Sequence, residues 1–212
     1  MPDIDIADIL LRLPALCIAF TVHEVAHGYT AYRLGDQSAK RDGRLSLNPL
    51  KHIDPLGMIC LLLFRFGWAK PVMVNPLNLK KPKRDMAIIA LAGPLSNVAL
   101  AVVAVLLWYP IGIRLSGGLG WSLASEFILL NLSLAVFNLL PVPPLDGSKV
   151  FTAFMSERDY FRFQERFDRY GFFVLLVLIW AGVTQTIISP LIIALYRGLF
   201  AVTGVLYAAF LP

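Results

Sequence analysis

The chain has 212 residues, of which 58% are hydrophobic and 16% are charged, and its mean hydropathy is +0.69. These values lie outside the range of soluble globular domains and predict an integral membrane protein. The formal net charge of +5 does not indicate nucleic-acid binding, because 16 of the 19 Lys and Arg residues fall in three connecting segments, 33–51, 65–84 and 149–169. Positive charge in short loops marks the cytoplasmic side of a membrane protein, so all three segments are predicted to be cytoplasmic.

The first predicted helix runs from Ile9 to Leu34 and ends before Gly35. The N-terminus has neither the basic region nor the small-residue cleavage site of a signal peptide, so this helix is expected to remain in the membrane. With a rise of 1.5 Å per residue, the HEVAH motif at 23–27 lies about 14 Å from the cytoplasmic end of the helix, near the middle of a hydrocarbon core about 30 Å thick. Ionisable groups at that depth are costly and therefore indicate a functional site.

Four further elements follow along the chain. Residues 48–66 contain several prolines and are too short to cross a bilayer, which favours a re-entrant or half-membrane segment. Residues 67–78 combine β-forming residues with two prolines and predict a short edge strand or an extended loop. Long apolar runs predict spanning helices at about 85–109 and 121–140, the second with Glu126 near its start.

The C-terminal part divides into a charged segment and an apolar one. Residues 156–170 mix charged and aromatic side chains, which is typical of an amphipathic helix on the membrane surface or of a polar connector. The last 40 or so residues predict one long helix or two shorter helices interrupted near Ser189 and Pro190. The whole chain, 1–212, is predicted to be a single all-α polytopic membrane domain with about five to six membrane helices, including the re-entrant or half-membrane segment.

The HEVAH motif has the spacing of a zinc hydrolase. His23 and His27 are four residues apart, so on a helix they share a face and can bind one Zn²⁺. Glu24 is placed to act as the base that takes a proton from zinc-activated water. Alternatively, the histidines could be core residues bonded to Glu24 and nearby hydroxyls, but two uncompensated imidazoles are hard to satisfy inside a membrane.

A catalytic zinc needs three protein ligands and one open position. His52 is the one remaining histidine and would complete a three-histidine site. Asp146 is favoured as the third ligand, because the PVPP sequence before it must open the backbone beside a cavity. The alternative role for Asp146 is the N-cap of a helix that begins near Gly147.

Four motifs together resemble a known family. HEVAHGYTAYRLGD, NPLKHIDPLG, AGPLSN and FNLLPVPPLDG occur in that order across about residues 20–150. They resemble the small bacterial and archaeal-type members of the site-2 protease family of intramembrane zinc metalloproteases. The resemblance implies one zinc per chain held by His23, His27 and Asp146, with Glu24 as general base. It also implies that Asn138 orients the substrate or stabilises the oxyanion, although a polar contact between helices would explain Asn138 equally well.

Two other polar residues in these motifs have no settled role. His52 could contact substrate, shuttle a proton or add a fourth ligand, and it could equally be a loop histidine that caps the re-entrant segment. Asn97, in AGPLSN, is expected to hold a helix contact near the site. Many family members carry an inserted PDZ or CBS domain, for which this chain has no room.

The expected activity is cleavage of the transmembrane segment of a single-span protein or peptide, in regulated intramembrane proteolysis or in clearance of signal-peptide remnants. Segment 67–76 could pair with the unwound substrate as an added strand. The expected location is the cell (inner) membrane, with the lipid bilayer and the substrate as partners. The rival functions are a membrane zinc transporter and a catalytically silent zinc-binding scaffold.

Overall fold

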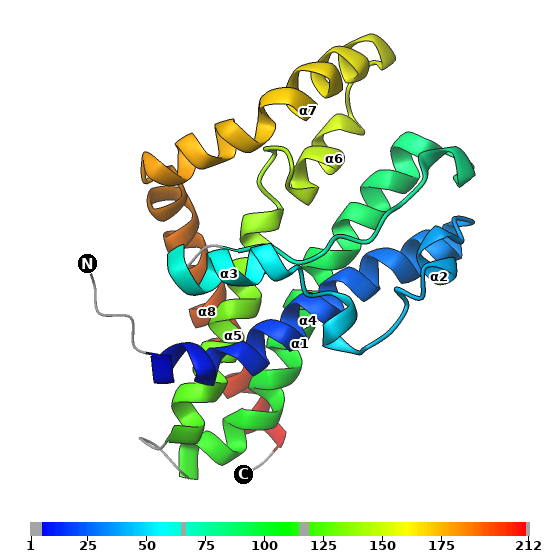
Figure 1. Cartoon of the computed structure of the whole chain (residues 1–212). Coiled ribbons are helices and arrows are strands. Elements are labelled where there is room, and N and C mark those ends of the chain that lie inside the picture. Colours follow the sequence, from blue (N-terminus) through cyan, green and yellow to red (C-terminus); the bar gives the residue numbers. More distant parts are fainter. Residues whose placement is uncertain (1–5, 65–66, 115–118, 211–212) are drawn as a thin grey trace.

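In a computed structural model, residues 6–64, 67–114 and 119–210 are described, and most of them are helical. The α-helices are α1 (Ile6–Leu34), α2 (Ser38–Arg41), α3 (Pro55–Phe64), α4 (Pro82–Arg114), α5 (Leu119–Asn138), α6 (Asp146–Thr152), α7 (Glu157–Trp180) and α8 (Val183–Phe210), and the 3-10 turns are η1 (Pro49–Lys51) and η2 (Pro76–Asn78). α6 and the start of α7 lie at one end of the bundle, and the C-terminus lies at the other (Figure 1).

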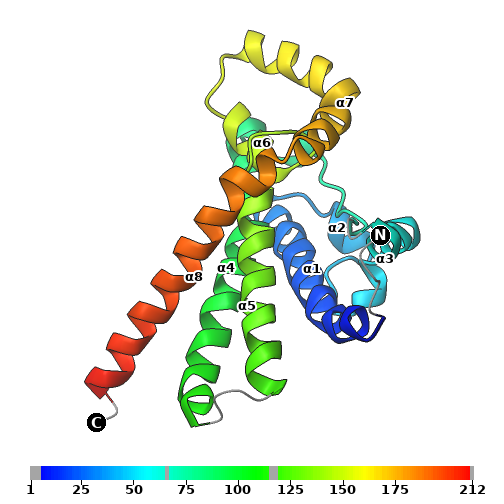
Figure 2. The same ribbon diagram turned by 90° about the vertical axis from the view of Figure 1, so that its left-hand side faces the viewer.

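Among the described residues, three helices are long and apolar enough to cross a membrane, over Pro82–Tyr109 in α4, Gly120–Asn138 in α5 and Gln185–Ala209 in α8. α4 and α5 run side by side, with α1 packed on one side of the pair and α8 on the other (Figure 2). Apolar side chains fill the interior between α4 and α5, and many large apolar side chains point outward. Outward apolar surface of this kind suits a lipid surrounding, so the predicted helical membrane fold is confirmed in outline.

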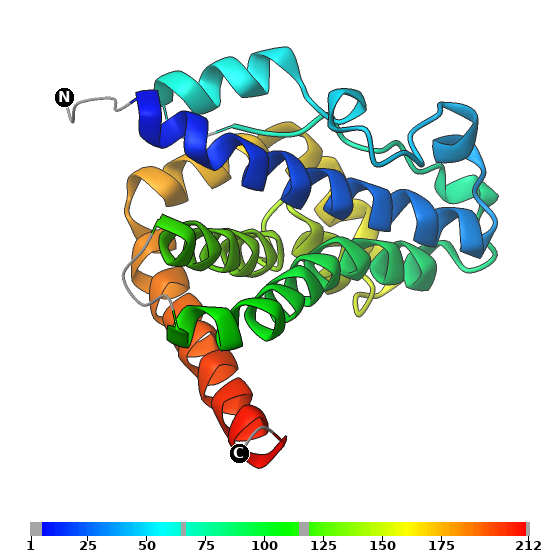
Figure 3. The same ribbon diagram turned by 90° about the horizontal axis from the view of Figure 1, so that it is seen from below.

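The segment that follows α3 is extended, but it forms no strand within the described part of the chain. It makes a single antiparallel bridge, between Ile53 and Ala69. Pro71 and Pro76 lack backbone N–H groups and cannot continue a ladder of hydrogen bonds, which explains why pairing stops there. α3 and this segment lie along the same side of α1 (Figure 3).

The C-terminal helices divide at a different point from the one predicted. Ser156 caps the start of α7, and α7 then runs unbroken from the charged segment into the apolar one and ends at Trp180. The interruption falls at Gly182, whose φ of 72° ends the helical path, and Pro190 lies inside α8. The prediction of a break near Ser189 and Pro190 was wrong, because a glycine in the left-handed region stops a helix while a membrane-type helix tolerates an internal proline.

Candidate metal centre

The two histidines of HEVAH lie on α1 and face the same point. His23 and His27 are buried, with exposed fractions of 6% and 8%. Their Nε2 atoms are 3.0 Å apart, and the rings meet edge to face. The i, i+4 spacing on a helix therefore brings both imidazoles to one position, as predicted from the sequence.

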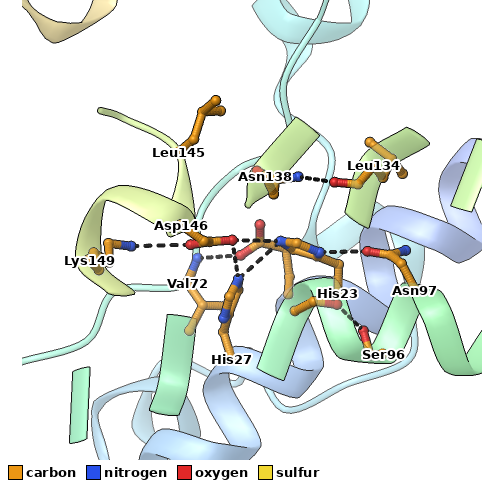
Figure 4. Close-up of polar contacts among 12 residues, drawn as sticks. His23, His27, Val72, Ser96, Asn97, Leu134, Asn138, Leu145, Asp146 and Lys149 are labelled. Atoms are coloured by element: carbon orange, nitrogen blue, oxygen red, sulfur yellow. Dashed lines mark hydrogen bonds and ion pairs between the residues drawn. The ribbon is translucent and has the colours of Figure 1, made fainter. Parts of the chain in front are cut away.

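Asp146 reaches the same point from the other end of the chain. Its Oδ2 atom lies 3.2 Å from His23 Nε2 and 3.0 Å from His27 Nε2 (Figure 4). Asp146 is the first residue of α6, and the N-cap position belongs to Leu145, which makes no side-chain capping bond. The alternative interpretation of Asp146 as an N-cap was therefore wrong.

The backbone around Asp146 is folded tightly against the end of α5. A Cβ atom at Gly147 would lie 2.1 Å from the Leu139 carbonyl oxygen, a distance that no side chain can occupy. The glycine of the LDG sequence therefore lets α6 approach the end of α5 closely enough to present Asp146 to the histidines.

The Nδ1 atom of each imidazole makes a hydrogen bond that determines which ring nitrogen carries the proton. His23 Nδ1 lies 2.7 Å from Asn97 Oδ1, and His27 Nδ1 lies 2.7 Å from the Ile89 carbonyl oxygen. The Asn97 amide is oriented by its Nδ2 group, which donates to the Ala19 carbonyl oxygen at 3.2 Å and to Asn131 Oδ1 at 2.9 Å. Both partners of the Nδ1 atoms are therefore acceptors.

The protons of the neutral imidazoles consequently sit on Nδ1, and both Nε2 atoms present lone pairs. One carboxylate oxygen and two nitrogen lone pairs converge with all ligand atoms within 4.8 Å of one another. Without a cation these groups repel, whereas tetrahedral zinc with bonds of about 2.0–2.1 Å places its ligands about 3.3 Å apart. The donor set therefore fits a zinc ion with three protein ligands.

Gly93 on α4 completes the space for the metal. A Cβ atom at this position would lie 2.5 Å from His27 Nε2 and 2.6 Å from His23 Nε2. The absence of a side chain at Gly93 thus allows α4 to pack closely at the point where the two imidazoles meet.

Glu24 faces an extended wall formed by residues 71–74. Its Oε2 atom accepts a hydrogen bond of 2.8 Å from the Val72 backbone N–H. The wall and the metal-binding side chains line a cavity of about 340 Å³, which Asn138 and Lys149 also line. This volume is at the lower end of the range for ligand pockets in proteins and gives room for a short stretch of peptide.

Hydrogen bonds hold the wall in place at both ends. The guanidinium of Arg44 donates to the carbonyl oxygens of Lys51, Lys70 and Pro71. At the other end, the Asn75 backbone N–H donates to Asp36 Oδ2 at 2.7 Å.

Asp36 is fully buried and accepts three further hydrogen bonds on Oδ1, two from Ser38 and one from the Asn78 amide. Burial raises the pKa of the Asp36 carboxyl, but these hydrogen bonds outweigh burial and hold the pKa below its ordinary value. The ionised carboxylate therefore fixes the end of the wall.

Two predicted candidates lie away from the metal ligands. Asn138 lines the cavity, and its Nδ2 donates to the Leu134 carbonyl oxygen on its own helix, so the described residues show no hydrogen bond from it to another helix. His52 is buried, and its Nε2 lies 2.8 Å from the Ser46 carbonyl oxygen. It lies outside the metal cluster, which favours a structural loop histidine over a fourth ligand.

The expected helix contact of Asn97 is confirmed by its hydrogen bonds to α1 and α5, but its fully buried partner Asn131 was not predicted. One signal was present: Gly93 and Asn97 are four residues apart, so they share a face of α4, and both contact His23. Nothing comparable in the sequence marks Asn131.

A helical membrane-type fold with an H-E-x-x-H pair and a converging carboxylate defines a zinc metalloprotease. The model of peptidase family M50 matches residues 119–182. The chain is 39% identical over 183 residues to a Bacillus subtilis (strain 168) protein named "Putative zinc metalloprotease YwhC", a match that covers 84% of this chain and 83% of the relative.

Two further relatives carry the same description. Rip2 of Mycolicibacterium smegmatis is 31% identical over 80% of this chain and 66% of its own length. MJ0611 of Methanocaldococcus jannaschii is 34% identical over 70% of this chain and 73% of its own length. No solved structure matches the chain. The chain belongs to peptidase family M50, the site-2 proteases, and is a zinc-dependent protease, which confirms the resemblance noted in its motifs.

Proposed function

We propose that this protein is an intramembrane zinc endopeptidase that cleaves the membrane segments of single-span proteins or peptides. His23, His27 and Asp146 hold the zinc in this proposal. The observation that supports it best is the position of the donor cluster, which is buried where α1 packs on α4, a helix long and apolar enough to span a membrane. Cleavage at this place requires a substrate that enters the membrane.

The catalytic chemistry follows from the groups that line the cavity. Zinc, when bound, lowers the pKa of a water molecule and polarises the scissile carbonyl. Glu24 takes the proton of that water and delivers it to the leaving amine. Its hydrogen bond to Val72 orients the carboxylate before substrate arrives. Asn138, on the cavity wall, orients the substrate backbone or stabilises the oxyanion.

The wall at 71–74 is suited to hold an unwound substrate. The Val72 N–H is engaged by Glu24 and the Asn75 N–H by Asp36, whereas no described residue accepts a hydrogen bond from the Met73 N–H. An extended peptide could pair with this group as an added strand. Such pairing would also compensate for the helical hydrogen bonds that the substrate loses on unwinding.

The membrane arrangement that accompanies this function has five to six membrane segments in a single domain. In this proposal α4, α5 and α8, which are long and apolar enough to do so, cross the bilayer, and the apolar end of α7 forms a short further segment. We propose that α1 crosses with them and that α3 enters the bilayer part way. The basic connecting segments face the cytoplasm, because Lys and Arg gather on that side. This arrangement suits a cell (inner) membrane, and the substrate is a single-span regulator or a signal-peptide remnant.

The rival functions make different demands on the structure. A zinc transporter needs several acceptor sites along a path, whereas the described residues contain a single cluster of three metal-binding side chains. A silent scaffold has no need of a carboxylate next to the metal ligands, where Glu24 lies. Both observations favour a protease.

The test uses purified protein in liposomes with a panel of single-span substrates, and compares wild type with Glu24→Gln and Asp146→Asn. Glu24→Gln should keep zinc and lose cleavage, and Asp146→Asn should lose both. Glu126→Gln is the matched control, because Glu126 is also a carboxylate on a membrane helix but pairs with Arg12. If zinc-loaded wild type cuts none of the substrates and moves zinc across the liposomes, the proposal is wrong.

A further inference from the structure

A second cavity adjoins the catalytic one. It has a volume of about 250 Å³ and lies where α6 and α7 meet the start of α4. Met86, Pro144 and Lys149 line both cavities and form the boundary between them. The second cavity is therefore a neighbour of the space in which a peptide would bind at the metal.

Two ammonium groups give the second cavity its charge. Lys149 Nζ lies 3.4 Å from Asp146 Oδ1, the oxygen that does not face the histidines. Lys83 on α4 donates to the Met155 carbonyl oxygen, and its ammonium lies 5.9 Å from the centre of the Tyr160 ring. No Asp or Glu is among the described residues that line this cavity, and Lys149 is paired with Asp146 outside it, so the excess positive charge comes mainly from Lys83.

The rest of the lining is apolar or aromatic. Tyr160 and Phe163 of α7 face the cavity from one side, and Pro143 and Pro144 face it from another. Apolar walls with two cations suit a ligand that has a short hydrocarbon stem and a negative head. The volume is sufficient for one such side chain and too small for a folded partner.

We propose that this second cavity is a substrate subsite that binds the carboxylate side chain of a Glu or Asp close to the scissile bond, through Lys83 and Lys149. The proposal rests on the proposed peptidase function and adds a sequence preference to it. A peptide is the occupant that the geometry favours, because this cavity shares Met86, Pro144 and Lys149 with the lining of the catalytic one. Lys149 also contacts a proposed zinc ligand, so Lys83 is the better residue to change.

The first experiment measures cleavage in liposomes. A single-span substrate with a mapped cut site carries Glu at each position flanking the cut in turn, and each Glu substrate has a Gln partner. Wild type should prefer Glu over Gln by about fivefold in kcat/KM at one position, the size expected for a partly desolvated ion pair. Lys83→Gln should bring this ratio close to one, and Lys83→Glu should reverse it.

The matched control is Lys81→Gln. Lys81 is an exposed cation two residues before Lys83 and does not line the cavity. It should keep the wild-type preference for Glu, which separates a local contact from a general loss of positive charge. The same measurements in neutral and in anionic liposomes test whether Lys83 binds lipid headgroups instead.

A second experiment measures binding without cleavage. Fluorescent peptide hydroxamates, which bind zinc directly, carry Glu or Gln at the positions next to the hydroxamate. Zinc-loaded wild type should bind one Glu peptide about fivefold more tightly than its Gln partner, and Lys83→Gln should not. This result supports the subsite even if no single-span substrate is cut, so failure of the subsite and failure of the protease proposal are distinguishable.

Three results would overturn the subsite. Equal kcat/KM for Glu and Gln substrates at every position, together with equal binding of the hydroxamates, excludes it. So does an equal loss for both substrates in Lys83→Gln. A Lys83 effect that depends on anionic lipid but not on the substrate residue assigns the cavity to lipid headgroups.

Discussion

Replacing Asn97 by Leu tests the role of the buried amide pair in holding the zinc site. The variant removes the acceptor for His23 Nδ1 and also leaves Asn131 Oδ1 without its donor. His23 then loses the bond that fixes its tautomer and ring position. Outer contacts of this kind change metal affinity by about 10- to 100-fold, or about 1.4–2.7 kcal/mol, so zinc should bind more weakly by that factor.

A double variant separates metal binding from folding. Loss of one partner of a buried hydrogen bond costs about 1–3 kcal/mol, whereas replacing both partners by apolar groups can be nearly neutral. Asn97→Leu combined with Asn131→Leu should therefore recover much of the stability that Asn97→Leu loses. It should not recover zinc affinity, because His23 Nδ1 still lacks an acceptor.

The assay is competition for zinc with a chromophoric chelator in detergent, combined with thermal unfolding of the metal-free protein. Asn131→Leu alone serves as the control for loss of the second amide, since it leaves the contact between Asn97 and His23 in place. Zinc affinity equal to wild type in Asn97→Leu would refute the assigned role, and so would joint recovery of stability and affinity in the double variant.

Three further changes probe the site and its wall. Gly93→Ala should abolish zinc binding, measured as metal content of the purified protein, because the added Cβ would lie within 2.6 Å of His23 and His27. Met73→Pro should reduce cleavage at least about tenfold with zinc retained if the wall pairs with substrate, whereas Met73→Ala keeps the N–H and should cleave like wild type. Asp36→Asn should destabilise the protein by about 1–3 kcal/mol near neutral pH, because its amide would meet the Asn75 N–H. The Asp36 pKa is lowered in the folded state, so its contribution is present above a pH of about 3.9 and is lost as pH falls through the folded pKa. The difference in thermal unfolding between the variant and wild type should therefore shrink in acid.

The sequence was most informative where chemistry depends on local spacing. His23 and His27 could be placed on one face of a helix from the i, i+4 rule alone. Asp146 could be placed beside them because three prolines in a membrane segment require a cavity or protein contact. These arguments do not depend on how each helix is oriented about its own axis relative to its neighbours.

Features that depend on which faces of two helices meet could not be predicted from the sequence. The contact between Asn97 and Asn131 exists only because α4 and α5 turn these faces toward each other, and nothing in the local sequence sets that angle. The break at Gly182 was missed for a related reason. By local propensity Pro190 is a stronger helix breaker than Gly182. Packing and a membrane surrounding nevertheless permit Pro190 inside α8.

The convergence of ligands from the two halves of the chain means that zinc acts as a cross-link. The metal would join α1 to α6 across 119 positions in sequence, between His27 and Asp146. A disulfide that closes a loop of about 100 residues stabilises a fold by about 4–5 kcal/mol in the chain-entropy description, and metal binding stabilises a fold by the same kind of constraint. Removal of zinc should therefore loosen α6 and the proline loop before it, while α1, α4 and α5 remain packed. Amide exchange in α6 would then report directly whether the metal is bound.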